Sequence, residues 1–184
     1  MATQALIIVD FQKDYFPGGK WLLEGIQSAA DNAVRALQHA RSTGQWVVHV
    51  RHEFADGQAP FLAAGSEGTR VYPGLAEQGD EPVIVKHQVN AFKDTRLAQL
   101  LSEWNIEQLL VVGNMSHVCV DAIVRAGADL GYKITVLHDA CATHDQTFNG
   151  VNIPAAQVQG AFMAGLAFGY AEVVSTEDYL AAHR

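Results

Sequence analysis

Cys119 stands where a strand-like run of residues changes into a helix-like pattern. The apolar run Leu109–Asn114 precedes it, and a helical pattern follows over Cys119–Leu130. A thiolate is the reactive form of cysteine, and it forms more readily at a helix N-terminus and near a lysine. Backbone N–H groups of the preceding turn would also point toward a developing oxyanion. We therefore predict that Cys119 is a nucleophile; the alternative is a small buried core thiol.

Two charged residues follow other apolar runs. Asp10 follows Ala5–Val9, and Lys86 follows Val83–Val85. In open α/β sheets ligands bind beyond the carboxyl ends of the strands, so both side chains are expected at the same edge as Cys119. There, Lys86 would keep Asp10 ionised, and the two together could deprotonate the thiol. The alternatives are a loop-anchoring or helix-capping aspartate and a solvated lysine at a strand end.

These three residues need a scaffold in which strands and helices alternate. Short apolar runs predict six strands, at Ala5–Asp10, Trp46–Arg51, Pro82–His87, Leu109–Asn114, Lys133–Asp139 and Glu172–Ser175. Longer patterns between them predict four helices, at Gln27–Thr43, Thr95–Trp104, Cys119–Leu130 and Pro154–Gly169. Continuous Val, Ile and Leu runs are typical of parallel strands buried on both faces. The alternation predicts an α/β fold, a doubly wound sheet with helices on both faces.

Two long segments, Asp14–Gly25 and Phe54–Gln78, lack such patterns and contain several Gly and Pro residues. Loops of this length in a compact domain are often lids or binding loops, and a plain surface connection is the alternative. The second cysteine, Cys141, ends the fifth predicted strand without a helix behind it. We interpret Cys141 as structural.

The composition excludes several classes of protein. The 184 residues, 49% of them hydrophobic and 17% charged, fit a single domain spanning residues 1–184. A net charge of −8 argues against a nucleic-acid partner. No run approaches the roughly 18 apolar residues that span a membrane, and the N-terminus lacks the basic region of a signal peptide. Two cysteines are too few for a disulfide framework, so we predict a cytoplasmic protein with no membrane partner.

The same residues lie in motifs that resemble the isochorismatase-like cysteine hydrolases, a superfamily that includes nicotinamidases and other small-amide hydrolases. The similarity covers nearly the whole chain. Its motifs are Ile8–Gln12, Lys86 with Asn90–Phe92, Gly113–Val120, Asp121–Ala122, Arg125–Ala126, Asp129–Tyr132 and His138–Ala142. The glycine-to-cysteine motif is specific, whereas the Asp and Lys motifs are weak individually.

The resemblance implies a catalytic triad of Asp10, Lys86 and Cys119 on a six-stranded parallel sheet. It also implies a non-proline cis peptide bond, here between Met115 and Ser116, that would point the N–H groups of Met115 and Cys119 into one oxyanion hole. Homo-oligomers are common in the family, so we expect a dimer or tetramer. The late helix, which is rich in small residues, would then be either buried in the core or pressed against another subunit.

Two departures from the family narrow the function. Nicotinamidases carry an Asp-x-His element and a further His that bind a metal, whereas the corresponding segment here reads His49-Val50-Arg51-His52-Glu53. On a strand, His49 and His52 point to opposite faces, and the following loop has no histidine, so we expect no metal and no other cofactor. True isochorismatases cleave a vinyl ether and lack a cysteine at the position of Cys119, which argues against that reaction.

A further set of residues is expected to support the reaction or to bind the substrate: Gln12, Phe16, Phe92, Ser116 and His117. The Gln12 amide could hydrogen-bond Asp10, and aromatic side chains commonly line apolar pockets. Solvent-facing loop positions and core packing are the alternatives. We interpret His52 as a structural histidine; the alternative is that it caps the site.

We therefore predict a cysteine-dependent hydrolase that cleaves a C–N bond of a small amide through a thioester intermediate. One alternative is a vinyl-ether or ester hydrolase on the same scaffold. The other is a catalytically silent binding subunit. The partner is a small-molecule substrate, whose identity is expected to depend on the two long loops and on any neighbouring subunit.

Overall fold

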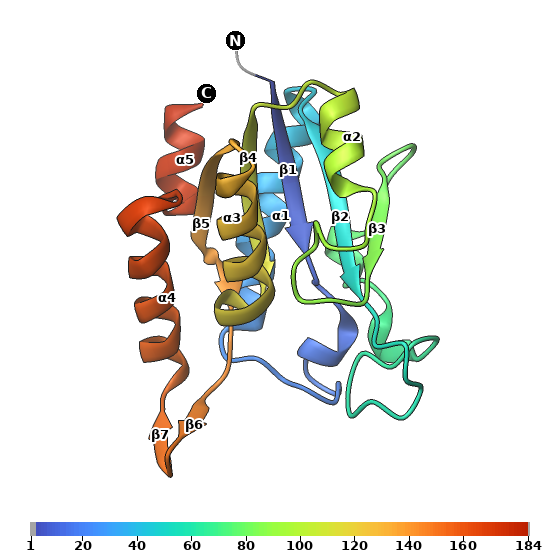
Figure 1. Ribbon diagram of the computed structural model, residues 1–184, viewed down its shortest axis with the longest axis vertical. Coiled ribbons are helices and arrows are strands. Elements are labelled where there is room, and N and C mark those ends of the chain that lie inside the picture. Colours follow the sequence, from blue (N-terminus) through green and yellow to red (C-terminus); the bar gives the residue numbers. More distant parts are fainter. Residues whose placement is uncertain (1–2, 184) are drawn as a thin grey trace.

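The computed structural model describes residues 3–183 and consists of one parallel sheet between two layers of helices (Figure 1). The strand order is β3-β2-β1-β4-β5-β8, and every neighbouring pair is parallel. The order changes direction between β1 and β4, which makes the carboxyl end of these two strands the switch point of the sheet. The strands are β1 (Gln4–Val9), β2 (Trp46–His52), β3 (Val83–Lys86), β4 (Gln108–Asn114), β5 (Lys133–Ala142) and β8 (Glu172–Val174).

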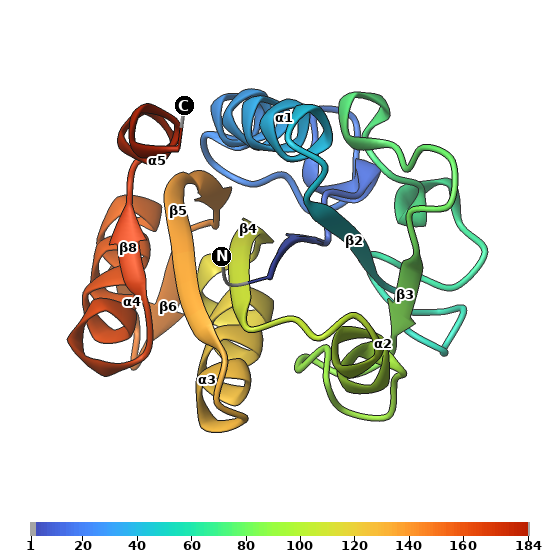
Figure 2. The ribbon, with the colours of Figure 1, turned by 90° about the horizontal axis from the view of Figure 1, so that it is seen from above.

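Helices cover both faces of the sheet. Figure 2 shows α1 (Ile26–Ser42) and α5 (Thr176–Ala182) on one face, with α2 (Leu97–Glu103), α3 (Asp121–Asp129) and α4 (Ala155–Gly169) on the other. The predicted three-layer, doubly wound α/β fold with six parallel strands is thus confirmed. Shorter helical turns lie at Lys13–Tyr15, Glu67–Thr69, Pro73–Leu75 and Ser116–Val120. No helix within residues 3–183 has the length and apolar character needed to cross a bilayer.

The central strand β1 shows why this arrangement is stable. Leu6 and Ile8 pack into the hydrophobic cluster beneath α1, while Ile7 and Val9 pack into the cluster beneath α2 and α3. Successive side chains of a strand point to opposite faces, so a continuous apolar run fills both layers at once. The run stops at Asp10, which leaves a polar side chain at the carboxyl edge of the sheet.

All six predicted strands and all four predicted helices are present, with their boundaries shifted by a few residues. The prediction missed α5 and a hairpin of β6 (Gln146–Phe148) and β7 (Val151–Ile153). The hairpin turns at Asn149 and Gly150, both with positive φ, which is the Asn-Gly signature of a tight turn. Both missed elements are too short to show a clear periodicity. The predicted domain 1–184 includes residues 1, 2 and 184, which lie outside the described residues.

Candidate active site

Reactive side chains from the ends of several strands lie together at the carboxyl edge of the sheet, beside the switch point. Asp10 follows β1, Lys86 ends β3, and Cys119 lies in the π-helical turn Ser116–Val120 that follows β4. The parallel register of β2 and β3 sets His52 opposite Lys86. The carboxyl edge of the sheet therefore gathers an acid, a lysine, a thiol and an imidazole.

The ammonium group of Lys86 lies at the centre of this cluster. Its Nζ is 2.9 Å from Oδ2 of Asp10, 3.2 Å from Sγ of Cys119 and 2.9 Å from Nδ1 of His52. Asp10 and Lys86 are 0% exposed, and Cys119 is 5% exposed. An ammonium has three N–H donors, and a buried charge is tolerated when it is paired and hydrogen-bonded. The structure thus brings together the three residues predicted to form a triad.

Burial and charge set the protonation of the cluster. Burial alone would lower the pKa of Lys86, but the neighbouring Asp10 and Cys119 raise it. Burial raises the pKa of the Cys119 thiol to about 12; Asp10 acts in the same direction, and Lys86 opposes both. Lys86 therefore favours the thiolate, as expected, but desolvation and the carboxylate outweigh it, so the expected net lowering of the thiol pKa is wrong for the resting site. At neutral pH the cluster holds an ammonium and a protonated thiol.

The turn that carries Cys119 begins with a non-proline cis peptide bond between Asn114 and Met115. The predicted position, Met115–Ser116, is wrong by one residue, because the chain changes direction where β4 ends and Ser116 already belongs to the helical turn. Gly113 has a φ of 146°, and a Cβ there would lie 2.2 Å from the carbonyl oxygen of Val9. Glycine therefore permits the close approach of β4 to β1 at the switch point.

Gln12 does not support Asp10 as predicted. Its Nε2 donates to the carbonyl oxygens of His52 (2.8 Å) and Thr69 (2.9 Å), and its Oε1 accepts from the N–H of His52 at 2.9 Å. The expectation is wrong because the buried amide pairs with backbone groups at the end of β2. Gln12 is instead a clamp that holds His52 and the distant Thr69 together.

Phe16 and Phe92 lie in different parts of the core. The Phe16 ring stacks on Tyr72 at a centroid distance of 4.3 Å, and the Phe92 ring stacks on Tyr132 at 6.1 Å. Phe16 belongs to the cluster beneath α1, whereas Phe92 packs against the cluster on the other face of the sheet. The structure therefore does not bring these two rings together as walls of one pocket.

Ser116 and His117 lie in the turn next to Cys119, as the sequence indicates. Ser116 is buried, and its Oγ has no hydrogen-bond partner among residues 3–183. His117 is half-buried, and its Nδ1 lies 2.7 Å from Oγ1 of Thr143. Burial, together with the nearby His144, lowers the pKa of His117.

Two residues that affect the cluster, His52 and Tyr15, were not among the predicted site residues. His52 was interpreted as structural, yet its ring bonds Lys86 directly. Burial raises the pKa of the Tyr15 phenol, and the charges of Asp10 and Cys119 raise it further. Tyr15 lies inside the predicted loop Asp14–Gly25 and belongs to none of the motifs. His52 could have been found only from the register between β2 and β3, which the sequence does not show.

A row of aromatic rings extends away from His52. The centroid distances are 4.4 Å from His52 to Phe54, 5.4 Å from Phe54 to Phe61 and 4.4 Å from Phe61 to Trp21. These rings come from the two long loops that were predicted to be lids or binding loops. The loops thus form an apolar wall that reaches the imidazole of the cluster.

Asp10, His52 and Cys119 have the donor atoms of a metal site, all within 4.8 Å of one another. A metal does not fit this set as it stands, because the Lys86 ammonium already contacts all three donors. The cation would meet a like charge at the position that it needs to occupy. His49 is held elsewhere, with Nε2 2.8 Å from Oε2 of Glu81, so the two histidines of β2 have separate partners.

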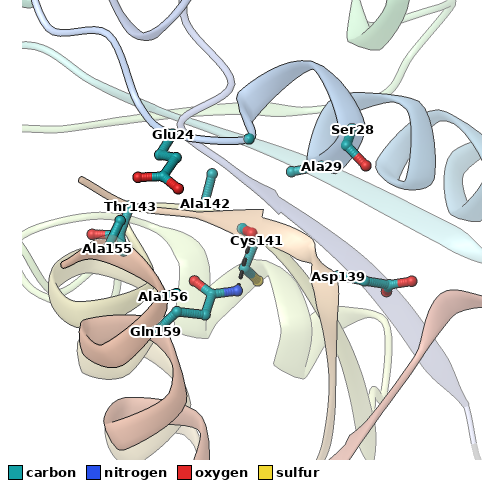
Figure 3. Close-up of a pocket in the computed structure, with 11 residues that line it drawn as sticks. Glu24, Ser28, Ala29, Asp139, Cys141, Ala142, Thr143, Ala155, Ala156 and Gln159 are labelled. Atoms are coloured by element: carbon teal, nitrogen blue, oxygen red, sulfur yellow. Dashed lines mark hydrogen bonds between the residues drawn. The ribbon is translucent and has the colours of Figure 1, made fainter. Parts of the chain in front are cut away.

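The second cysteine lies against a separate pocket of about 290 Å³ between α1, the end of β5 and α4 (Figure 3). The carbonyl oxygen of Cys141 accepts a hydrogen bond from Nε2 of Gln159 at 3.1 Å. Burial raises the pKa of its thiol to about 12. Its Sγ donates to the carbonyl oxygen of Leu137 at 3.4 Å, and no lysine is among the groups that shift its pKa. These contacts are those of a structural thiol.

The family model, the related sequences and the solved structures that match this chain all indicate the same family. The family model described as "Isochorismatase domain" matches residues 4–177. An uncharacterized isochorismatase family protein, YddQ of Bacillus subtilis, is 42% identical over 97% of this chain and 99% of its own length. The crystal structure of a putative isochorismatase hydrolase from Oleispira antarctica has a TM-score of 0.94 and 48% identity, and the match covers 97% of this chain and 96% of that chain.

Two further relatives have names that state an activity. A streptothricin hydrolase of Streptomyces noursei is 34% identical over 78% of this chain and 51% of its own length. A maleamate amidohydrolase of Pseudomonas putida is 29% identical over 73% of this chain and 70% of its own length. The family match over almost all of the chain, joined to the geometry of the cluster, leads to one conclusion. The chain belongs to the isochorismatase family and is a hydrolase.

Proposed function

We propose that this hydrolase cleaves the C–N bond of a small amide, with Cys119 as the nucleophile, Asp10 as the acid and base, and Lys86 as the residue that aligns them. The observation that carries the proposal is the buried Lys86 ammonium, which forms an ion pair with the Asp10 carboxylate and at the same time donates a hydrogen bond to the Cys119 sulfur. The names of the related enzymes support an amide bond as the target, since one of them is an amidohydrolase.

The raised pKa of Cys119 decides how the reaction starts. A thiol with a pKa of about 12 is almost entirely protonated at neutral pH, so the proton must leave as the sulfur attacks. Asp10 takes this proton while the S–C bond forms and the carbonyl electron pair moves to oxygen. Lys86 lowers the cost of the negative charge that passes from the carboxylate to the sulfur and then to the oxygen.

The second half of the reaction returns the proton. The tetrahedral intermediate collapses as the C–N bond breaks, and the leaving amine takes the proton from Asp10, which leaves a thioester on Cys119. Asp10 then takes a proton from a water molecule as the water oxygen attacks the thioester carbonyl. When the C–S bond breaks, the sulfur recovers that proton and the carboxylic acid product leaves.

The oxyanion would be held by the backbone N–H groups of Met115 and Cys119. The turn after β4 supports this assignment, because the N–H of Met115 donates to no protein acceptor within residues 3–183. A free backbone donor beside the nucleophile is the element that an oxyanion hole needs.

A mass-spectrometric search tests the proposal. The wild-type protein is incubated with a panel of small primary amides and quenched in acid, and the Cys119 peptide is examined for an acyl adduct. An adduct on Cys119, absent from Cys119→Ala and present in Cys141→Ala, is the expected result. Turnover retained in Cys119→Ala would rule out the covalent mechanism. A chain that neither turns over nor acquires an adduct with any amide, ester or vinyl ether would be a silent binding subunit.

The predicted homo-oligomer and cytoplasmic location also stay proposals. Apolar side chains are exposed on α4 and on the β6–β7 hairpin, namely Phe148, Val151 and, at 94% exposure, Phe168. The hairpin and Phe168 lie at opposite ends of α4, so they are two separate exposed sites. The nearly fully exposed Phe168 supports self-association through the late helix, and it is one place where a second copy would bind.

A further inference from the structure

A pocket of about 250 Å³ lies at the amino edge of the sheet, opposite the catalytic cluster. It is found where β2 begins at Trp46, where Pro82 leads into β3 and where Trp104 follows α2. The arrows of β2 and β3 in Figure 1 point away from this edge, toward the end of the sheet where Lys86 lies. The seven residues of β2 separate the two edges, so this pocket is distinct from the site of the proposed reaction.

An exposed tryptophan forms one wall of the pocket. The rings of Trp46 and Trp104 are stacked, with a centroid distance of 4.1 Å and an interplanar angle of 19°. Trp104 also packs against the core cluster beneath α2 and α3, whereas Trp46 is 43% exposed. The face of an indole ring is electron-rich and attracts cations. The one cation–π contact among residues 3–183 joins Arg125 to Tyr170, so no cation of the described chain lies over Trp46.

The charges around the pocket are acidic and only partly balanced. The lining holds the carboxylates of Asp80 and Glu81 and no lysine, arginine or histidine. From outside the lining, Arg41 donates two hydrogen bonds of 2.8 and 2.7 Å to Glu81, and Nε2 of His49 lies 2.8 Å from the same carboxylate. Asp80 is exposed and forms no ion pair with any residue from 3 to 183. A negative charge without a partner therefore lies beside the exposed indole.

We propose that this pocket binds the guanidinium group of a small molecule other than the hydrolysed substrate. A guanidinium is planar and always charged, so it can stack on the open face of Trp46 while its N–H groups donate to the Asp80 carboxylate. An alkylammonium has the charge without the plane, and a urea has the plane without the charge. Arg41 already binds the neighbouring Glu81 carboxylate through the same group. The volume lies just below the range of about 300–1,000 Å³ typical of ligand pockets, which favours a small compound.

The indole signals in NMR spectra test this proposal without turnover. The chain has three tryptophans, whose ¹⁵N-labelled indole N–H signals are assigned by replacing each in turn with Phe. Three probes of similar size are titrated at constant ionic strength and far below denaturing concentrations: N-ethylguanidinium, the neutral planar N-ethylurea and the charged non-planar propylammonium. N-ethylguanidinium should shift the signals of Trp46 and Trp104 and bind about ten-fold more tightly than the other two probes. Trp21, whose indole bonds His144 in another part of the fold, is the internal control whose signal should not move.

Paired variants separate a defined site from general attraction to an acidic chain. Asp80→Asn should weaken the binding of N-ethylguanidinium about five-fold or more, whereas Asp56→Asn removes the same charge from an exposed loop beyond the other edge and should change nothing. Trp46→Leu should abolish binding, and Trp46→Phe should leave an intermediate affinity because Phe has the weaker ring face. Circular dichroism checks that each variant is folded.

Several results would each overturn the proposal: N-ethylurea or propylammonium binding as tightly as N-ethylguanidinium, no shift at Trp46, a loss of affinity in Asp56→Asn equal to that in Asp80→Asn, or undiminished binding in Trp46→Leu. Cys119→Ala should bind N-ethylguanidinium like the wild type. A loss of binding in Cys119→Ala would place the ligand at the catalytic cluster and would also refute this assignment. Because no probe is turned over, these outcomes are independent of whether Cys119 forms a thioester.

Discussion

Replacing Asp10 by Asn should make Cys119 easier to alkylate and, at the same time, abolish hydrolysis. The Asp10 carboxylate raises the pKa of the thiol, and the reactive atoms of the two residues lie within 4.8 Å of each other. At that separation and an effective dielectric constant of about 20, one negative charge costs a thiolate about 3.5 kcal/mol, or roughly 2.5 pKa units. The neutral amide removes this cost, so alkylation at a fixed pH should be more than about 100-fold faster.

Hydrolysis should respond in the opposite direction. Asn cannot take the thiol proton or return it to the leaving amine, and the loss of a positioned acid–base group lowers turnover by about 10²- to 10⁴-fold. A change that affected only the fold would slow hydrolysis without moving the alkylation–pH profile to lower pH.

The assay is the rate of iodoacetamide alkylation of the Cys119 peptide, measured by mass spectrometry from about pH 7 to about pH 10. Below the thiol pKa this rate follows the thiolate fraction, so a lower pKa appears as faster alkylation at every pH in the range. A Cys141→Ala background removes the second thiol and provides the matched control. If the profile of Asp10→Asn stays in place or moves to higher pH, the carboxylate is not coupled to the thiol, and the argument from burial and charge fails.

Four further predictions follow from the same geometry. Lys86→Met should move the alkylation profile to higher pH, because Lys86 lowers the thiol pKa; it should also cost about 3–5 kcal/mol of stability in urea unfolding by stranding the buried Asp10 charge. Cys119→Ala should abolish hydrolysis and Cys141→Ala should spare it, as measured by release of the amine product. A chelator should leave activity unchanged, because Lys86 occupies the place of a metal; activity lost to the chelator and restored by zinc, iron or manganese would contradict this. Phe168→Asp should lower the mass found by light scattering to that of one chain, whereas an unchanged oligomer would place the interface elsewhere.

The fold could be predicted because its signals are local. Continuous apolar runs such as Ala5–Val9 bury both faces of a strand, and Asp10 or Lys86 then marks the point where the run meets the carboxyl edge of the sheet. The convergence of Asp10, Lys86 and Cys119 follows from topology alone, because parallel strands bring their carboxyl ends to one edge. The position of the nucleophile could therefore be predicted from the sequence.

The remaining features of the site depend on contacts between distant segments. The partner of His52 is set by the register of β2 against β3, and the partners of Gln12 lie 40 and 57 residues away along the chain. The pKa of Cys119 depends on its burial, which no local pattern reports, and burial reversed the expected direction of the shift. The cis bond moved by one residue because its place depends on where β4 ends.

The clamp formed by Gln12 has a consequence for how this enzyme can change. One buried amide holds both His52 and Thr69, so the segment 53–68 leaves the site and returns to it at points that are tied to each other. Loops that run between fixed ends tolerate changes of sequence and length at little cost. Phe54 and Phe61 lie on this segment. The segment, and with it part of the aromatic wall, can therefore be replaced while the nucleophile, the acid and the lysine keep their positions. Grafting this segment from a relative is thus a direct route to altered substrate preference.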